Sequence, residues 1–180
     1  MKAKRMILSV FPLLLAGMLS GCSNSKSPDV TDNIRKSLDQ AGFKDVSVSE
    51  DRDKGVVALT GSVPTDSDKQ QAESIAKSDA PNLVVADQIS VRPPGNESEA
   101  KAVDSDLDKA IEKNLDATLV KHRLKKNVKY DVKNGVVTLT GDVASPAKRE
   151  QVEKLAASVP NVKQVVNELE VKGQKATSTS

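Results

Sequence analysis

Aromatic residues are almost absent from this chain of 180 residues, which has two phenylalanines, one tyrosine and no tryptophan. We therefore expect hydrophobic cores built from aliphatic side chains. The single cysteine, Cys22, excludes an intramolecular disulfide. The single histidine, His122, excludes a metal site made of several His and Cys ligands. Single-stranded nucleic acid is commonly bound by stacking on aromatic side chains, so a nucleic-acid partner is not expected.

Catalytic motifs are also lacking. His122 would need an orienting carboxylate and a nucleophile, but its sequence neighbours are Lys121 and Arg123. No Gly-x-Ser-x-Gly turn accompanies the serines, and no glycine-rich loop precedes a Lys-Ser or Lys-Thr pair. The sequence thus predicts a protein that is not an enzyme and that holds no cofactor and no metal.

Residues 1–21 have the layout of an export signal. The segment opens with three basic residues, Lys2, Lys4 and Arg5. The apolar run that follows, residues 6–18, is too short for a stable span of a hydrocarbon core about 30 Å thick. It ends in Leu19-Ser20-Gly21-Cys22, which resembles the bacterial lipoprotein box of a Leu, two small residues and a Cys.

The resemblance to a lipoprotein box implies that the mature chain begins at a lipidated Cys22. Several acyl chains anchor a protein stably where one chain does not. Residue 23 is Ser and not Asp, which in lipoprotein sorting favours the outer membrane. Residues 22–27 are then a short lipidated tether. The alternative is an ordinary secretory signal followed by an accidental cysteine.

One nine-residue stretch occurs twice. Gly55–Val63 returns 80 residues later as Gly135–Val143, with seven of the nine positions identical. Val57, Leu59 and Val63 recur at a period of two, which predicts a strand with one buried face. A glycine late in this strand, Gly61, fits a bulge or a close approach of backbones.

The segments around the two strands share one order of elements: helix, strand, strand, helix, strand. We assign copy one to residues 28–92 and copy two to residues 103–173, with a polar linker at 93–102 and a disordered tail at 174–180. In copy two the first helix is expected to bury Leu107, Ala110, Ile111 and Leu115. The predicted fold class is α+β: two tandem αββαβ domains, each a three-stranded sheet covered on one face by two helices. The pattern leaves the strand order open.

These residues resemble the BON domain, named for bacterial OsmY and nodulation proteins. The resemblance rests on the repeated Gly-Val-Val-x-Leu-Thr-Gly-x-Val strand, on the helix after it and on the closing stretch Val162–Leu169. Copy one has a looser closing stretch at residues 83–87. The resemblance implies an envelope lipoprotein at the periplasm or outer membrane, a role in envelope integrity or osmotic stress, affinity for phospholipid, and no catalysis.

Charge distinguishes the two copies. Copy one has 8 basic and 12 acidic residues, whereas copy two has 13 basic and 11 acidic residues. The basic residues of copy two cluster after its first helix, and five are candidate contacts for lipid headgroups: Lys121, Arg123, Lys125, Lys126 and Lys129. Leu119, Val120 and Leu124 alternate with them and are candidates for insertion among the headgroups. In the alternative interpretation, this segment is a solvated cationic surface whose apolar residues belong to the core.

Two functions are compatible with these features. In the first, a lipid-anchored protein binds membrane phospholipid through its second domain. In the alternative, sheet edges and helix faces bind envelope proteins, as a chaperone or adaptor does. Ionic strength distinguishes them, because salt weakens headgroup binding by basic residues and spares apolar contacts.

Overall fold

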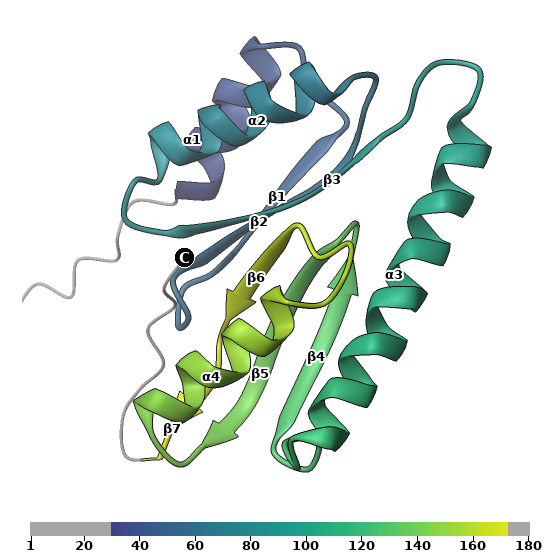
Figure 1. The fold of residues 1–180 in the computed structure, drawn as a ribbon. Helices are drawn as coiled ribbons and strands as arrows, with labels where there is room; N and C mark the ends of the chain where they lie inside the picture. The colour runs from purple at the N-terminus through teal and green to yellow at the C-terminus, as the bar shows by residue number, and fades with distance from the viewer. Residues whose placement is uncertain (1–29, 173–180) are drawn as a thin grey trace, which may run out of the picture.

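The computed structural model describes residues 30–172 (Figure 1). The predicted export signal, the lipidation at Cys22, the tether and the tail at 174–180 lie outside the described residues. The first domain contains α1 (Val30–Gln40), β1 (Val46–Asp51), β2 (Val56–Val63), α2 (Asp66–Asp79) and β3 (Val84–Val91). The second contains α3 (Glu97–Lys121), β4 (Val128–Lys133), β5 (Val136–Val143), α4 (Pro146–Ala157), β6 (Gln164–Asn167) and β7 (Glu170–Val171). This order confirms the predicted α+β fold of two tandem domains.

The repeated strand is the central strand of each sheet. In the first domain β2 pairs with β1 antiparallel and with β3 parallel, in the order β1-β2-β3. In the second domain β5 pairs with β4 antiparallel and with both β6 and β7 parallel. The expected third strand of copy two therefore exists in two pieces, separated by Glu168 and Leu169.

Each domain buries an aliphatic core between its sheet and its helices. In the first domain Ile34 and Leu38 of α1 and Ala72 and Ala76 of α2 are fully buried, packed with Leu59 and other residues of the strands. The alanines let α2 lie close to the sheet. Helix α2 begins after Thr65, because the Thr65 side chain accepts a hydrogen bond from the first turn in a capping box. Figure 1 shows α1 and α2 together on the outer side of the first sheet.

Helix α3 is longer than the sequence suggested. It begins at Glu97, so residues 97–102 of the expected linker are helical. Beyond Gly95 these residues include neither glycine nor proline, and their charged and alanine residues favour helix. The expected buried stripe is also corrected at its start: Leu107 and Ala110 are exposed, and the fully buried positions are Ile111, Leu115 and Leu119.

The face of each sheet without helices is covered in part by the other domain. Five buried residues from the two sheets form a third core, between the domains: Val56, Val84, Ala86, Val136 and Val166. Val56 and Val136 occupy the same place in the repeat. The prediction that the repeated strand buries one face is therefore wrong at this end of the strand, where Val57 and Val137 face the helices and Val56 and Val136 face the partner sheet.

Polar side chains complete the contact between domains along the outer edge of β3. The Gln164 amide accepts a hydrogen bond from Asp87 N at 3.1 Å and donates one to Val85 O at 2.8 Å. Asn134 Nδ2 donates to Gln88 O at 2.6 Å. An unpaired strand edge offers backbone groups to other chains, and here the second domain occupies them.

Gln164→Ala is expected to lower the free energy of unfolding by about 1–2 kcal/mol, because it leaves a buried backbone N–H and C=O on β3 without partners. Urea denaturation measures this loss, and amide hydrogen exchange at Asp87 is expected to accelerate. Gln40→Ala, at the exposed end of α1, is the matched control. Equal stability of the two variants would show that the Gln164 contact does not hold the domains together.

Candidate functional site

The basic residues of copy two lie where α3 ends and the chain turns toward β4. Arg123 has a left-handed backbone with φ of 58°. Its N–H donates to Val120 O at 3.0 Å, and the Leu124 N–H donates to Leu119 O at 2.8 Å. These two bonds close the helix end with a left-handed C-cap, a turn that normally favours glycine. In the first domain the same pair of bonds surrounds Gly42.

This turn determines which of the neighbouring apolar residues are buried. It folds Leu124 back toward Leu119, and both lie in the core of the second domain with 5% and 0% of their surface exposed. The expectation that Leu119 and Leu124 insert among lipid headgroups is therefore wrong. Val120 is 57% exposed and is the one of the three that faces solvent.

Four of the five candidate cations form no ion pair with other residues in the described part of the chain. Lys121, Arg123, Lys126 and Lys129 are exposed and form no ion pair within residues 30–172. Lys125 differs, because it pairs with Asp116 and its Nζ lies 4.6 Å from the centroid of the Tyr130 ring. Its hydrogen bond to Asp116 raises the pKa of Lys125 and lowers that of Asp116. Lys125 is thus partly neutralised, whereas the other four form an exposed cationic surface.

The structure adds a fifth basic residue, Lys172, to this surface. Lys172 follows β7 and lines a surface depression together with Lys126 and Lys129. Sequence reasoning missed it because it is more than 40 residues away along the chain. The alignment of β7 beside β5 brings it to the same end of the sheet.

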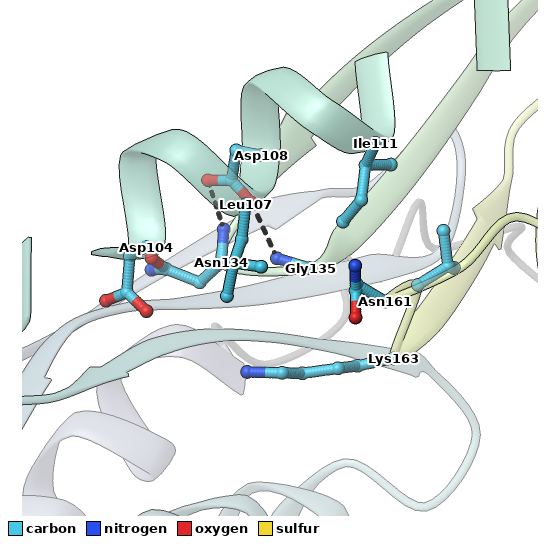
Figure 2. Close-up of a pocket in the computed structure, with 9 residues that line it drawn as sticks. Asp104, Leu107, Asp108, Ile111, Asn134, Gly135, Asn161 and Lys163 are labelled. Carbon is cyan, nitrogen blue, oxygen red and sulfur yellow. Dashed lines mark hydrogen bonds between the residues drawn. The ribbon is translucent and has the colours of Figure 1, made fainter. Parts of the chain in front are cut away.

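A small pocket of about 190 Å³ lies between α3 and the turns of the second domain (Figure 2). The Asp108 carboxylate accepts hydrogen bonds from the backbone N–H groups of Asn134 and Gly135 at 2.8 and 2.9 Å. Asp104, at its rim, bonds to the Ser90 hydroxyl of the first domain. The Asp108 carboxylate thus stabilises the β4–β5 turn, and the Asp104 carboxylate stabilises the contact between the domains. In the described part of the chain no cluster of three or more His, Cys, Asp or Glu residues has the arrangement of a metal site.

Each domain also buries one polar cluster between its second helix and its third strand. In the first domain Lys69 Nζ lies 3.6 Å from Asp87 Oδ2 and donates to Ile89 O at 2.7 Å. The second domain has Arg149 and Asn167 at the positions 80 residues later, and Arg149 donates to Asn167 O at 2.9 Å. Sequence reasoning missed this cluster, although the offset of 80 residues that relates the repeated strands also relates these residues.

The Asp87 carboxylate of the first domain and the Asn167 amide of the second differ in charge. Burial raises the pKa of Asp87, and the charge of Lys69 only partly opposes this. Asn167 is fully buried and neutral; its Nδ2 donates to Glu153 Oε2 at 2.8 Å. Both clusters join a helix to a strand, and the cluster of the first domain also borders a surface pocket.

Residues 30–172 contain no helix long and apolar enough to cross a bilayer. Comparison with protein families matches the BON domain to residues 26–93 and 104–173. Over 146 residues the chain is 30% identical to osmotically-inducible protein Y of Escherichia coli (strain K12), covering 79% of this chain and 71% of that protein. Structural similarity to the C-terminal domain of CdsD, a structural protein of the type III secretion system of Chlamydia trachomatis, is low: the TM-score is 0.34 at 17% identity, over 81% of this chain and 98% of that one. The two family matches, one to each half of the repeat, show that this chain belongs to the BON-domain family.

Proposed function

We propose that this protein is a non-catalytic lipoprotein of the bacterial envelope that supports membrane integrity under osmotic stress. In this proposal Cys22 carries the lipid anchor in the outer membrane, and the second BON domain binds anionic phospholipid. Membership of the BON family and the similarity to osmotically-inducible protein Y support the envelope role. The exposed cations at one end of the second domain support the lipid contact, and this is the observation on which the proposal depends.

The asymmetry between the domains favours a functional origin of these cations. The segment 121–129 has five basic residues and no acidic one, whereas the corresponding segment 40–47 of the first domain has one of each, Lys44 and Asp45. Each basic group near an anionic bilayer contributes about 1 kcal/mol of binding free energy, over a screening distance of about 8–10 Å.

The backbone at Arg123 adds a second argument. A non-glycine residue in a left-handed conformation costs roughly 1 kcal/mol, and copy one avoids the cost with Gly42. Copy two therefore keeps a cation at a position where glycine would be more stable. Strain of this kind is often retained where a side chain serves binding.

Binding to vesicles tests the proposal. The chain from residue 22 with Cys22→Ser lacks the anchor, and we expect it to sediment with phosphatidylglycerol vesicles and not with phosphatidylcholine vesicles. Replacing Lys121, Arg123, Lys126 and Lys129 by glutamine should weaken this binding by several hundredfold, given about 1 kcal/mol for each cation. Arg123→Gly alone should weaken binding while raising thermal stability.

The matched control removes four exposed lysines elsewhere, Lys36, Lys44, Lys77 and Lys101, and so has the same net charge. Its vesicle binding should stay close to that of the parent chain. Equal loss in both variants would show that net charge alone acts, and the proposed surface would have to be abandoned.

A protein-binding or chaperone function is the alternative, and one feature favours it. Val103 and Leu107, one turn apart on α3, are 58% and 38% exposed. Apolar binding of a client protein to this face would persist at high salt, whereas headgroup binding would decline. Crosslinking that recovers one abundant envelope protein with the parent chain but not with a Val103→Ser, Leu107→Ser variant would favour this alternative.

A further inference from the structure

Three lysines from separate segments meet at one end of the second sheet. Lys126 lies in the turn before β4, Lys129 lies on β4, and Lys172 follows β7. They line a depression of about 530 Å³ whose other lining residues are Asn127, Thr140, Gly141 and Asp142. We propose that this depression is a phosphate subsite, which receives the phosphate ester of a lipid headgroup or a free phosphate ester. The inference rests on the proposed lipid function and assigns its anion contact to these three residues.

Gly141 permits the close approach that forms the depression. It pairs with Val128, and its φ of 115° belongs to a conformation that other residues rarely adopt. A Cβ at this position would lie 2.2 Å from Asn127 O. Because glycine has no Cβ, the turn that carries Lys126 lies directly beside β5, and Asp142 N donates to Asn127 O at 3.2 Å.

The register of the strands positions the other two lysines. Lys129 is the cross-strand partner of Thr140, so its side chain and the threonine hydroxyl lie on the same face of the sheet. Lys172 N donates to Val143 O at 3.1 Å, which continues the pairing of β7 with β5. A lysine ammonium and a hydroxyl are both donors to phosphate oxygens.

The charges of the depression favour an anion. Three lysines line it against one acidic residue, Asp142. Glu170 is the strand partner of Asp142, but its carboxylate pairs with Lys54 of the first domain. The contact between domains therefore directs this second carboxylate away from the lysines.

The first domain has the same backbone arrangement with different side chains. Gly61 pairs with Val46 as Gly141 pairs with Val128, and Arg92 N donates to Val63 O as Lys172 N donates to Val143 O. In this register Asp45 corresponds to Asn127 and Ser47 to Lys129. Copy one thus keeps cations at two of the three positions, Lys44 and Arg92, but has an acid and a serine where copy two has an amide and Lys129. It is therefore an internal comparison for Lys129.

NMR titration of the uniformly labelled chain with Cys22→Ser tests the subsite. Glycerol 3-phosphate should shift the amide signals of Thr140, Gly141 and Asp142 and leave those of Thr60, Gly61 and Ser62 unchanged. Sodium chloride at matched ionic strength should not reproduce these shifts. Lys129→Ser, which copies the first domain, and Lys172→Ala should each weaken the apparent affinity about fivefold, the effect of roughly 1 kcal/mol. Both residues are exposed, so both variants are expected to fold.

A second experiment measures the binding of the parent chain and the two variants to phosphatidylglycerol vesicles. Loss of glycerol 3-phosphate shifts and of vesicle binding in the two variants would support the subsite with a lipid as its source. Shifts without any vesicle binding by the parent chain would support the subsite for a free phosphate ester and refute the proposed function. The subsite would be overturned if Lys129→Ser and Lys172→Ala left vesicle binding unchanged and if the NMR shifts were absent or reproduced by sodium chloride. That outcome would leave the proposed function intact.

Discussion

Gly141→Ala is expected to lower the free energy of unfolding by about 4 kcal/mol, at the upper end of what single substitutions cause. The residue has φ of 115°, where an L side chain is strained by about 1–3 kcal/mol. A Cβ there would also lie 2.2 Å from Asn127 O, a backbone atom that a side-chain rotation cannot move. The strands β4 and β5 would have to separate at Val128 and expose the core beneath them.

Denaturation by urea, followed by circular dichroism, measures this loss. Gly61→Ala should cause a loss of similar size, because its Cβ would lie 2.0 Å from Asp45 O. Gly95→Ala is the matched control: Gly95 also has positive φ, at 87°, but no atom lies within 4 Å of an added Cβ. The control should lose only about 1 kcal/mol. If Gly141→Ala and Gly95→Ala are equally stable, the close approach of backbones is not what requires glycine.

The structural role of the glycine within the repeated strand was predictable from the sequence, and so was the fold around it. A period of two identified Val57 and Leu59 as core residues, and the same glycine late in both strands indicated a bulge or close approach. These are local properties, because alternation and backbone conformation act between near neighbours.

The contact between domains was not predictable from these patterns. Val56 and Val136 occupy positions that alternation assigns to solvent, and they are buried only because the two sheets meet. Gln164 is a polar residue within a strand, yet its amide occupies the edge of β3 in the other domain. Copy two has one more residue between Asn161 and Asn167 than copy one has between Asn82 and Asp87. This irregularity in the repeat was the signal in the sequence that the segment around Gln164 differs between the copies.

The cationic surface was predictable in composition but not in geometry. The cluster of basic residues after α3 is visible in the sequence. In contrast, the burial of Leu119 and Leu124 and the exposure of Val120 depend on the left-handed turn at Arg123. Lys172 joins the surface only through the pairing of β7 with β5. The two domains therefore share a backbone, and function is to be sought where their side chains differ at equivalent positions.

Asn167→Asp gives the second domain the acidic residue that the first domain has at the equivalent position, Asp87. The substitution is expected to lower the free energy of unfolding by about 3 kcal/mol at neutral pH. Asn167 is fully buried, and its Nδ2 donates to Glu153 Oε2 at 2.8 Å. The substitution removes this donor and places a second carboxylate beside Glu153. Arg149 donates to the backbone oxygen of residue 167, and its charge offsets only part of the repulsion. The reciprocal substitution Asp87→Asn gives the first domain the amide of the second and should change stability by less than about 1 kcal/mol.

The dependence on pH separates this explanation from a loss of packing. Burial raises the pKa of Asp87 in the folded state, and the carboxyl introduced at position 167 should behave in the same way. An acid with a raised pKa binds its proton more tightly in the folded state, so its contribution to stability is complete below the unfolded pKa and is lost as pH rises through the folded pKa. Asn167→Asp should therefore cost clearly less at about pH 4 than at about pH 7.5, because the protonated carboxyl again donates to Glu153. Asp87→Asn should remove the corresponding pH dependence from the first domain. Urea denaturation of the parent chain and both variants at the two pH values measures this, and a cost for Asn167→Asp that is the same at both would assign the effect to packing.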